Sequence, residues 1–336
     1  MTPVAVVILN YNGQQLLRQF LPTVIAYSSG ASMVVIDNGS TDGSQQLLAT
    51  TFPSVRIIQL DKNYGFCGGY NRGLAQVAEE IVVLLNSDVE VTPDWLAPLT
   101  TLLDGDKSIA SVQPKILSFH KRDTFEYAGA GGGLIDALGY PFCRGRLFAY
   151  AEKDEGQYND ERPVFWSSGA CMAVRLHLFK ELGGFDEDFF AHMEEIDLCW
   201  KLHRLGYKVY YTGHSVVYHV GAGTLAYQSP RKTYLNFRNG LTMIFKHFSV
   251  AEVSYKFPIR IGLDWIACAL FIVKGQFGNA TAVLQAHVSF MLRLKDNIAK
   301  RRAWRTDAAS TARDNTYRGS IVWDYYLLGK KRIVDQ

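Results

Sequence analysis

Residues 81–90 read Ile-Val-Val-Leu-Leu-Asn-Ser-Asp-Val-Glu, and this stretch decides the fold. Five consecutive apolar residues, rich in β-branched side chains, are typical of a strand that is buried on both faces in the middle of a parallel sheet. The run then ends in Asn86, Ser87 and Asp88. Ligands of open α/β sheets bind beyond the carboxyl ends of the strands, so Asp88 is the first candidate for contact with a ligand or metal. The alternative, a capping role at the following helix, suits Thr92 better because Pro93 follows it.

Three upstream segments repeat this arrangement of an apolar strand followed by polar residues. Strands are predicted at residues 4–9, 33–37 and 55–60, and apolar residues recur at helical spacing after the first of them. Strands that alternate with helical segments predict an α/β fold with a right-handed, mostly parallel sheet, which nucleotides favour. Further strands are predicted at residues 109–117, 166–175, 208–212 and 215–220. Residues 119–163 lack a clear period and predict a long irregular insertion.

A glycine-rich segment precedes the 81–86 strand. Residues 61–73 read Asp-Lys-Asn-Tyr-Gly-Phe-Cys-Gly-Gly-Tyr-Asn-Arg-Gly. Glycines let the backbone approach a ligand closely, and Arg72 is suited to phosphate. The pattern matches neither G-x-G-x-x-G nor a P-loop, which argues against a dinucleotide oxidoreductase or a P-loop ATPase. A glycine-rich helix start packed tightly on the sheet explains Gly68 and Gly69 equally well.

An acidic segment, residues 183–201, is the second candidate for chemistry. Four charged residues recur at helical spacing in a helix expected from about 193 to 205, and they predict one solvated, ion-paired face: Glu194, Asp197, Lys201 and Arg204. Glu195 lies one turn before Leu198 and is directed inward. Burial of an unpaired carboxylate raises its pKa, which suits a general base that works near neutral pH. The alternative role for Glu195 is an internal ion pair with an arginine.

Composition indicates a globular protein with a substantial core: 336 residues, 48% of them hydrophobic, with a net charge of +3. The five cysteines show no C-x-x-C spacing, which argues against a disulfide framework or a structural zinc site and favours a reducing compartment. The first strand begins at Val4 without a basic, apolar leader before it. We therefore expect no signal peptide and a cytoplasmic protein, with no nucleic acid among its partners.

The C-terminal part differs in character from the rest. Residues 257–273 are strongly apolar, but Arg260 and Asp264 interrupt them, and the run is too short and too charged to span a membrane. Residues 280–292 form an apolar stripe at helical spacing, and basic residues are in excess after Arg293. Two interpretations stay open: a helical hairpin that closes the core, or an amphipathic platform on the inner membrane leaflet whose basic tail meets anionic lipid.

Six short motifs, found between residues 4 and 245, resemble in their order those of the family 2 inverting nucleotide-sugar glycosyltransferases, and especially their bacterial rhamnosyltransferase-like members. They are residues 6–12 (Val-Val-Ile-Leu-Asn-Tyr-Asn), 35–44 (Val-Ile-Asp-Asn-Gly-Ser-Thr-Asp-Gly-Ser), 63–73 within the glycine-rich segment, 84–89 (Leu-Leu-Asn-Ser-Asp-Val), 183–190 (Gly-Gly-Phe-Asp-Glu-Asp-Phe-Phe) and 194–200 (Glu-Glu-Ile-Asp-Leu-Cys-Trp). Each motif is short, and the ordered set is specific.

The resemblance implies a GT-A fold, with a mostly parallel central sheet flanked by helices. It divides the chain into a glycosyltransferase domain, residues 1–245, and a helical extension with a basic tail, residues 246–336. Within the domain, residues 1–108 form the nucleotide-sugar-binding half, and residues 109–245 form the acceptor and catalytic half.

The resemblance also implies roles for single residues. Asp37 matches the acid that contacts the nucleobase, Asp88 the acid that binds Mg²⁺ or Mn²⁺, Glu195 the catalytic base, and His219 a histidine that helps to hold the metal or the diphosphate. The other expected donor-binding residues are Asn10, Asn63, Gly65, Asn71, Arg72, Asn86 and Ser87. The expected acceptor region comprises Trp166, Ser168, Gly169 and Glu194.

Two positions depart from the family pattern. Asn86 replaces the first acid of the Asp-x-Asp motif, which leaves fewer negative groups for a metal. Glu195 stands where many relatives have Asp, and it carries the same chemistry one methylene further out. Nearby aromatic residues offer rings on which a sugar can stack, although such residues usually belong to the core: Tyr140, Phe142, Phe165 and Trp166.

The function implied by the resemblance is transfer of a sugar from a nucleoside-diphosphate sugar to a hydroxyl of a glycan or lipid-linked acceptor, with inversion, in cell-surface polysaccharide synthesis. Two alternatives remain. A non-catalytic nucleotide-sugar-binding protein is favoured if Asn86 abolishes metal binding. A sugar nucleotidyltransferase normally has a glycine-rich, basic loop after its first strand, where this chain has Asn-Tyr-Asn-Gly at residues 10–13.

Overall fold

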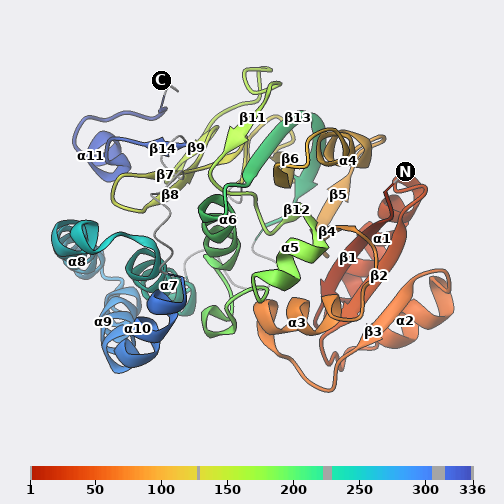
Figure 1. The fold of residues 1–336 in the computed structure, drawn as a ribbon, viewed down its shortest axis with the longest axis horizontal. Helices are drawn as coiled ribbons and strands as arrows, with labels where there is room; N and C mark the ends of the chain where they lie inside the picture. Colours follow the sequence, from red (N-terminus) through yellow and green to blue (C-terminus); the bar gives the residue numbers. More distant parts are fainter. Residues whose placement is uncertain (1, 127–128, 222–228, 305–314, 334–336) are drawn as a thin grey trace.

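A nine-stranded sheet runs through the middle of the protein, with helices on both faces (Figure 1). The computed structural model describes residues 2–126, 129–221, 229–304 and 315–333. The strands are β1 (Val4–Asn10), β2 (Ser32–Asp37), β3 (Arg56–Gln59), β4 (Ile81–Asn86), β5 (Val89–Val91), β6 (Ile109–Ser118), β7 (Gly133–Asp136), β8 (Pro141–Cys143), β9 (Arg146–Leu147), β10 (Tyr150–Ala151), β11 (Glu161–Val164), β12 (Cys171–Arg175), β13 (Lys208–His219) and β14 (Thr316–Tyr317). The helices are α1 (Gln14–Tyr27), α2 (Ser44–Thr51), α3 (Gly65–Leu74), α4 (Leu96–Gly105), α5 (Leu176–Glu181), the 3₁₀ turn η1 (Glu187–Phe189), α6 (Glu194–Arg204), α7 (Pro230–His247), α8 (Val250–Val273), α9 (Phe277–Leu292), α10 (Leu294–Ala303) and α11 (Ile321–Tyr326).

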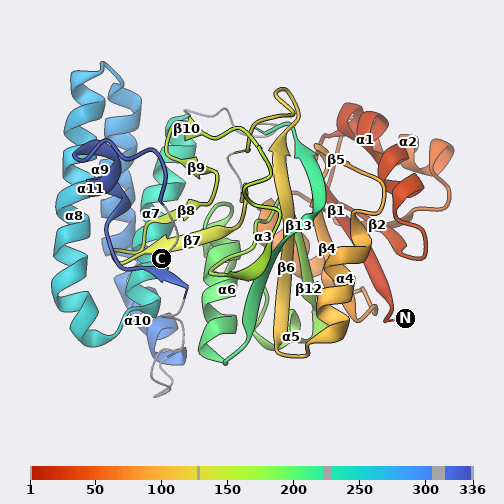
Figure 2. The same cartoon turned by 90° about the horizontal axis from the view of Figure 1, so that it is seen from above.

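The main sheet has the strand order β11-β13-β6-β12-β4-β1-β2-β3, with β5 paired to β13. Strands β3, β2, β1 and β4 are parallel to one another, and β12 joins β4 in antiparallel orientation. The second half adds the parallel pair β6 and β13. A smaller five-stranded sheet, β10-β9-β8-β7-β14, lies beside it (Figure 2). The predicted α/β class is thus confirmed, with a nucleotide-binding type of sheet in the first half.

Strand β4 shows why this sheet sits at the centre of the core. Val82 and Leu84 pack into the cluster beneath α3, α5 and α6. Ile81, Val83 and Leu85 face the other way, into the cluster beneath α1, α2 and α4. All five side chains are fully buried, which is the two-sided burial that the apolar run predicts.

The structure differs from the sequence predictions in the segment between β6 and β12. Residues 119–163 are not an irregular insertion: they carry β7 to β10 of the smaller sheet and β11 at the edge of the main one. These strands are two to four residues long, so none repeats its side-chain alternation often enough to be recognised in the sequence.

Three local predictions are also corrected. The strand expected at 166–175 begins only at Cys171, because Ser168 accepts hydrogen bonds from the backbone of residues 170 and 171 and forms a turn. The strands expected at 208–212 and 215–220 are one strand, β13, with a register shift between Thr212 and Val216. Thr92 caps no helix: its hydroxyl donates to the Val216 carbonyl oxygen, and α4 begins at Leu96.

The C-terminal helices pack on the catalytic half and on one another, on the side of the molecule opposite α1 and α2 (Figure 2). The expected boundary at residue 245 falls inside α7, which packs against α9 and α10.

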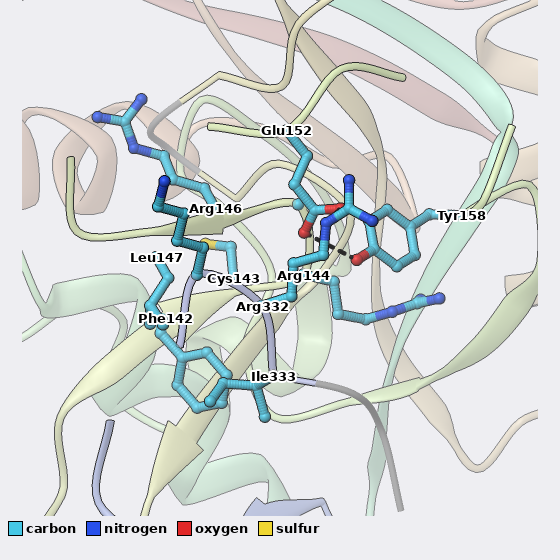
Figure 3. Close-up of a pocket in the computed structure, with 11 residues that line it drawn as sticks. Phe142, Cys143, Arg144, Arg146, Leu147, Glu152, Tyr158, Arg332 and Ile333 are labelled. Carbon is cyan, nitrogen blue, oxygen red and sulfur yellow. Dashed lines mark hydrogen bonds and ion pairs between the residues drawn. The ribbon is translucent and has the colours of Figure 1, made fainter. Parts of the chain in front are cut away.

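The end of the chain packs on the smaller sheet. Strand β14 pairs with β7 of this sheet, and residues 331–333 lie against the β8–β9 hairpin (Figure 3). Arg332 contacts Glu152 there at 2.9 Å. The pocket there encloses only about 10 Å³, room for one water at most.

Candidate active site

The first predicted site residues meet where β1, β2 and β4 end. Asn10 lies beside Asp37 in the β1–β2 register, and the β1–β4 register places Asn86 beside the preceding residue of β1. The Asn10 amide donates to the Asp37 carboxylate at 3.3 Å, and Gln45 donates to the same carboxylate at 2.7 Å. Asp37 is completely buried. It therefore holds the loops after β1 and β2 together, and its contact with a nucleobase stays a prediction.

Asn63 and Gly65 shape the entry to α3. The Asn63 side chain accepts hydrogen bonds from the Gly65 backbone at 2.8 Å and from the Asn38 amide at 3.1 Å. Gly65 has a φ of 72°, and a Cβ there would come within 2.7 Å of the Phe190 ring. Only glycine tolerates both conditions. The glycine-rich segment therefore brings its backbone close to the turn before α6.

Asn71 and Arg72 contact that turn rather than the strand ends. The Asn71 side chain exchanges two hydrogen bonds of 2.9 Å with the Phe185 backbone. Arg72 pairs with Glu187 at 2.8 Å and stacks over Tyr64 at 3.9 Å. In the described structure both residues thus fasten α3 to the 185–187 turn, and donor binding by either one remains a prediction.

The structure brings the predicted metal residues together. The two ring nitrogens of His219 each face a carboxylate at 3.2 Å, Nε2 facing Asp88 and Nδ1 facing Glu126. The Asn86 amide nitrogen lies 3.4 Å from the same Nε2, while Ser87 is half-buried beside it. Burial opposes protonation of His219, but the hydrogen bonds to the two carboxylates outweigh it and raise the pKa to about 10. The site thus favours one positive charge between two acids, of which Asp88 is buried and Glu126 is partly buried.

The turn before α6 is unusual in its backbone. Phe190, His192 and Met193 all have positive φ values, 64°, 70° and 73°, which L-residues rarely adopt. Asn239 of α7 stabilises this conformation, because its amide donates to the carbonyl oxygens of residues 189, 191 and 192 at 2.8 to 3.0 Å. Arg238 adds bonds to the carbonyls of residues 188 and 189. Such strain persists only where the surroundings enforce it, and it often marks a functional site.

Two neighbouring carboxylates, Glu194 and Glu195, begin α6. Each has one buried oxygen, Oε2, without a hydrogen-bond partner among the described residues. Burial raises the pKa of Glu195 to about 7, and burial with the adjacent Glu195 charge raises the pKa of Glu194 well above its usual value. Glu195 is partly exposed, whereas Glu194 is buried. Glu195 is therefore a carboxylate of near-neutral pKa with a free oxygen, as a general base requires.

The predicted solvated face of α6 is wrong. Asp197 is fully buried and pairs with Lys246 and His247 at 2.8 Å and with Lys201 at 3.2 Å. Glu194 and Lys201 are buried as well. The reason is tertiary: α7 covers this face and supplies Lys246 and His247. Burial opposes ionisation of Asp197, but the lysine charges prevail and hold its pKa well below its usual range.

The expected acceptor residues divide into two groups. Trp166 and Ser168 are buried and bonded internally, Trp166 to the Leu134 carbonyl oxygen and Ser168 to Gln113. Phe165, like Trp166, belongs to the core and offers no ring to a sugar. Gly169 and Glu194 lie beside the catalytic candidate: a Cβ on Gly169 would be 4.0 Å from Cβ of Glu195, and Glu194 precedes Glu195 in α6.

The Cys143 thiol is influenced both by a carboxylate of the His219 cluster and by one at the start of α6. Burial is the main reason that the pKa of the Cys143 thiol rises to about 12, and the charges of Glu126 and Glu195 also raise it. Both carboxylates are therefore within electrostatic reach of one side chain. Comparison with known proteins identifies the family: the model of glycosyl transferase family 2 matches residues 5–183, more than half of the chain.

The chain belongs to glycosyl transferase family 2. An N-acetylglucosaminyl-diphospho-decaprenol L-rhamnosyltransferase of Mycobacterium tuberculosis is 30% identical over 65% of this chain and 76% of its own length. A low-salt glycan biosynthesis hexosyltransferase of Haloferax volcanii is 24% identical over 70% of this chain and 73% of its own length. The protein is thus a glycosyltransferase, and its resemblance to rhamnosyltransferases is confirmed at the level of sequence.

Solved structures show the same fold. GalNAc-T7 with UDP, GalNAc and Mn²⁺ superposes with a TM-score of 0.56 at 16% identity, covering 73% of this chain. This chain spans only 48% of the length of that protein. The mannosyltransferase of Pyrobaculum calidifontis, in complex with GDP-Man and Mn²⁺, gives a TM-score of 0.53 at 16% identity and covers 86% of this chain and 87% of its own. The GT-A architecture of the glycosyltransferase is therefore established.

The donor set around His219 suits a divalent cation. Within the described ranges, no three His, Cys, Asp or Glu side chains are already arranged as a metal site. However, the imidazole lies between the carboxylates of Asp88 and Glu126, and its raised pKa favours the protonated form there. A cation that displaced this proton would meet carboxylate oxygens and an imidazole nitrogen, which are ligands for Mn²⁺ and, through oxygen, for Mg²⁺.

Sequence reasoning missed three residues of the glycosyltransferase site. Glu126 lies in the segment without periodicity, so no pattern linked it to His219. Asn239 stands in the middle of a helix, and only the tertiary fold shows that it holds the turn before α6. Asn38 donates to the Gly65 carbonyl oxygen and so links the end of β2 to α3. It follows Asp37 directly within one of the family motifs, and this position could have identified it from the sequence.

Proposed function

We propose that this glycosyltransferase moves a sugar from a nucleoside-diphosphate sugar to a hydroxyl of a lipid-linked glycan, with inversion at the anomeric carbon. One observation carries the proposal: Glu195 has a carboxylate oxygen without a hydrogen-bond partner among the described residues, and burial raises its pKa to about 7. A carboxylate in this state accepts a proton at neutral pH, when an acceptor hydroxyl is placed against it.

The mechanism is a single displacement. Glu195 removes the proton of the acceptor hydroxyl as that oxygen attacks the anomeric carbon, and the nucleoside diphosphate leaves from the opposite face. Burial and the neighbouring Glu195 charge raise the pKa of Glu194 well above its usual value, which favours the neutral form and so disfavours a second negative charge beside the base. Asp88 and His219 would hold Mg²⁺ or Mn²⁺, and the cation would neutralise the charge that develops on the diphosphate.

The acceptor class is inferred from the relatives. The mycobacterial relative is named for the transfer of L-rhamnose to N-acetylglucosaminyl-diphospho-decaprenol, a sugar linked to a prenyl chain through a diphosphate. The haloarchaeal relative and an O-antigen biosynthesis protein of Myxococcus xanthus also act in glycan synthesis by name. Together they support a role in cell-surface polysaccharide synthesis for this chain.

A contact with the inner face of the cell membrane is part of the proposal. Among the described residues, no helix combines the length and apolar character that crossing a bilayer requires. Helix α8 nevertheless exposes apolar side chains along its outer face, with Ile266 58% and Val273 84% exposed. Some basic residues of the tail are engaged within the protein, as Lys300 is with Asp188 at 2.7 Å. Arg305 and Arg313 lie outside the described residues.

The test is a product analysis. Purified protein is incubated with a panel of nucleoside-diphosphate sugars, Mn²⁺ or Mg²⁺, and a prenyl-diphosphate-linked N-acetylhexosamine. We expect nucleoside diphosphate release that depends on the acceptor, and a product whose new anomeric configuration, by NMR, is opposite to that of the donor. Retention of configuration, or release of pyrophosphate instead of nucleoside diphosphate, would reject the proposal.

A further inference from the structure

An open groove lies between α7 and α9, outside the site described above. It measures about 490 Å³, within the range of small-molecule sites. Its lining is mostly apolar and consists of Tyr234, Thr281, Leu284, Gln285, Val288, Ser289 and Leu292. Leu284, Val288 and Leu292 are 41%, 58% and 81% exposed. Three aliphatic side chains exposed along one helix face form an apolar surface that a ligand can cover with a gain in free energy.

The groove adjoins the turn that leads into the catalytic helix. Tyr234 closes one wall, and its hydroxyl donates to Ser289 at 2.9 Å. The Arg238 guanidinium lies 5.2 Å from the centre of the Tyr234 ring and also donates to the carbonyl oxygen of Asp188 at 2.7 Å. One arginine thus contacts both the groove wall and the strained turn before Glu195.

Positive charge surrounds the junction between groove and turn. Arg293 follows the last groove residue of α9 and pairs with Asp188 at 3.2 Å, and its side chain is still 43% exposed. Arg231 is exposed and lies 5.0 Å from the centre of the Phe190 ring. Lys232 is close enough to His192 to contribute to the lowering of that imidazole pKa, after burial, to about 4. An anionic group between the turn and the groove would therefore meet several cations.

We propose that the groove between α7 and α9 binds the hydrocarbon chain of a prenyl-diphosphate-linked acceptor, with the diphosphate at the cationic junction and the acceptor sugar at Glu195. The inference rests on the proposed function and adds where this acceptor lies. An apolar groove that begins at a cationic junction matches a ligand with an anionic head and an apolar chain. A peptide or a second copy of the chain would have no need of a cationic junction beside the reaction centre.

The test compares two acceptors with the same sugar, one on farnesyl diphosphate and one on methyl diphosphate. Val288→Glu places a charge in the groove, and Leu328→Glu is the matched control, because the two side chains are similarly exposed, 58% and 56%, and Leu328 lies after α11, outside the groove. We expect Val288→Glu to raise KM for the farnesyl acceptor at least tenfold and to leave the methyl acceptor unchanged. Leu328→Glu should alter neither.

A binding measurement without turnover supports the same distinction. Fluorescent farnesyl diphosphate should bind the wild type and the Leu328→Glu variant equally, and Val288→Glu at least tenfold more weakly. The inference is overturned if Val288→Glu leaves the farnesyl acceptor unaffected, if it impairs both acceptors equally, or if the Leu328→Glu control loses as much. It is also overturned if sedimentation shows a dimer that Val288→Glu dissociates. Absence of transfer to either acceptor by the wild type, with normal farnesyl diphosphate binding, would count against the proposed function and leave the groove assignment standing.

Discussion

Replacement of Asp197 by Asn is expected to destabilise the protein strongly, although the residue lies two positions from the proposed base and not on the reaction path. The carboxylate is fully buried and balances Lys246, Lys201 and His247 at 2.8 to 3.2 Å. Removal of one partner from a buried ion pair leaves uncompensated charge and costs about 3 to 5 kcal/mol. Asp197→Asn keeps the shape and loses the charge, so we expect a loss of this size in the free energy of unfolding.

Urea titrations followed by circular dichroism measure this difference from the shift of the midpoint at constant slope. Asp123→Asn, which breaks an exposed pair with Lys153, is the control and should unfold like the wild type. The pKa of Asp197 lies well below that of an unfolded aspartate, so its stabilisation is present above about pH 4 and is lost as the pH falls further. Asp197→Asn should lack this part of the acid dependence. A variant within about 1 kcal/mol of wild type at pH 7 would refute the buried-cluster reasoning.

Three further outcomes are expected. Asp88→Asn, at a strand end, should fold normally but lose most of its Mn²⁺ affinity by calorimetry together with donor turnover; unchanged Mn²⁺ binding would remove Asp88 from the metal site. Asp37→Ala should raise the donor KM more than it lowers kcat, and it should cost about 1 to 3 kcal/mol of stability because Asn10 and Gln45 lose a buried partner; a fall in kcat alone would contradict the nucleobase contact. Ile266→Asp on α8 should reduce flotation with anionic liposomes, and equal flotation of variant and wild type would exclude α8 as the membrane contact.

The strands and their polar ends were predictable because they depend on local patterns. The run from Ile81 to Asn86 forms the predicted strand, buried on both faces, and the carboxyl ends of neighbouring parallel strands brought Asn10 next to Asp37. Helical spacing also predicted an inward Glu195, and its Oε2 is buried, but Glu195 as a whole is more exposed than its neighbours Glu194 and Asp197, which the same spacing had placed in solvent.

What could not be predicted depends on residues far apart in the chain. The acids of α6 looked solvated because their spacing carries no information about α7, whose Lys246 lies 49 residues after Asp197. Glu126 meets His219 across 93 residues. The strands of residues 119–163 were not predicted because each is too short to repeat the alternation of apolar and polar side chains.

The most direct test of the account is the pH dependence of kcat for the wild type, Glu195→Gln and Glu194→Gln. Glu195 must be deprotonated to act as the base, so wild-type kcat should fall about tenfold per pH unit below about pH 7. Glu195→Gln should bind the donor normally, lose about two to four orders of magnitude in kcat and lack this acidic limb. Glu194→Gln resembles the protonated Glu194 and should keep most of its activity. An inactive Glu194→Gln beside an active Glu195→Gln would contradict the account and assign the base to Glu194.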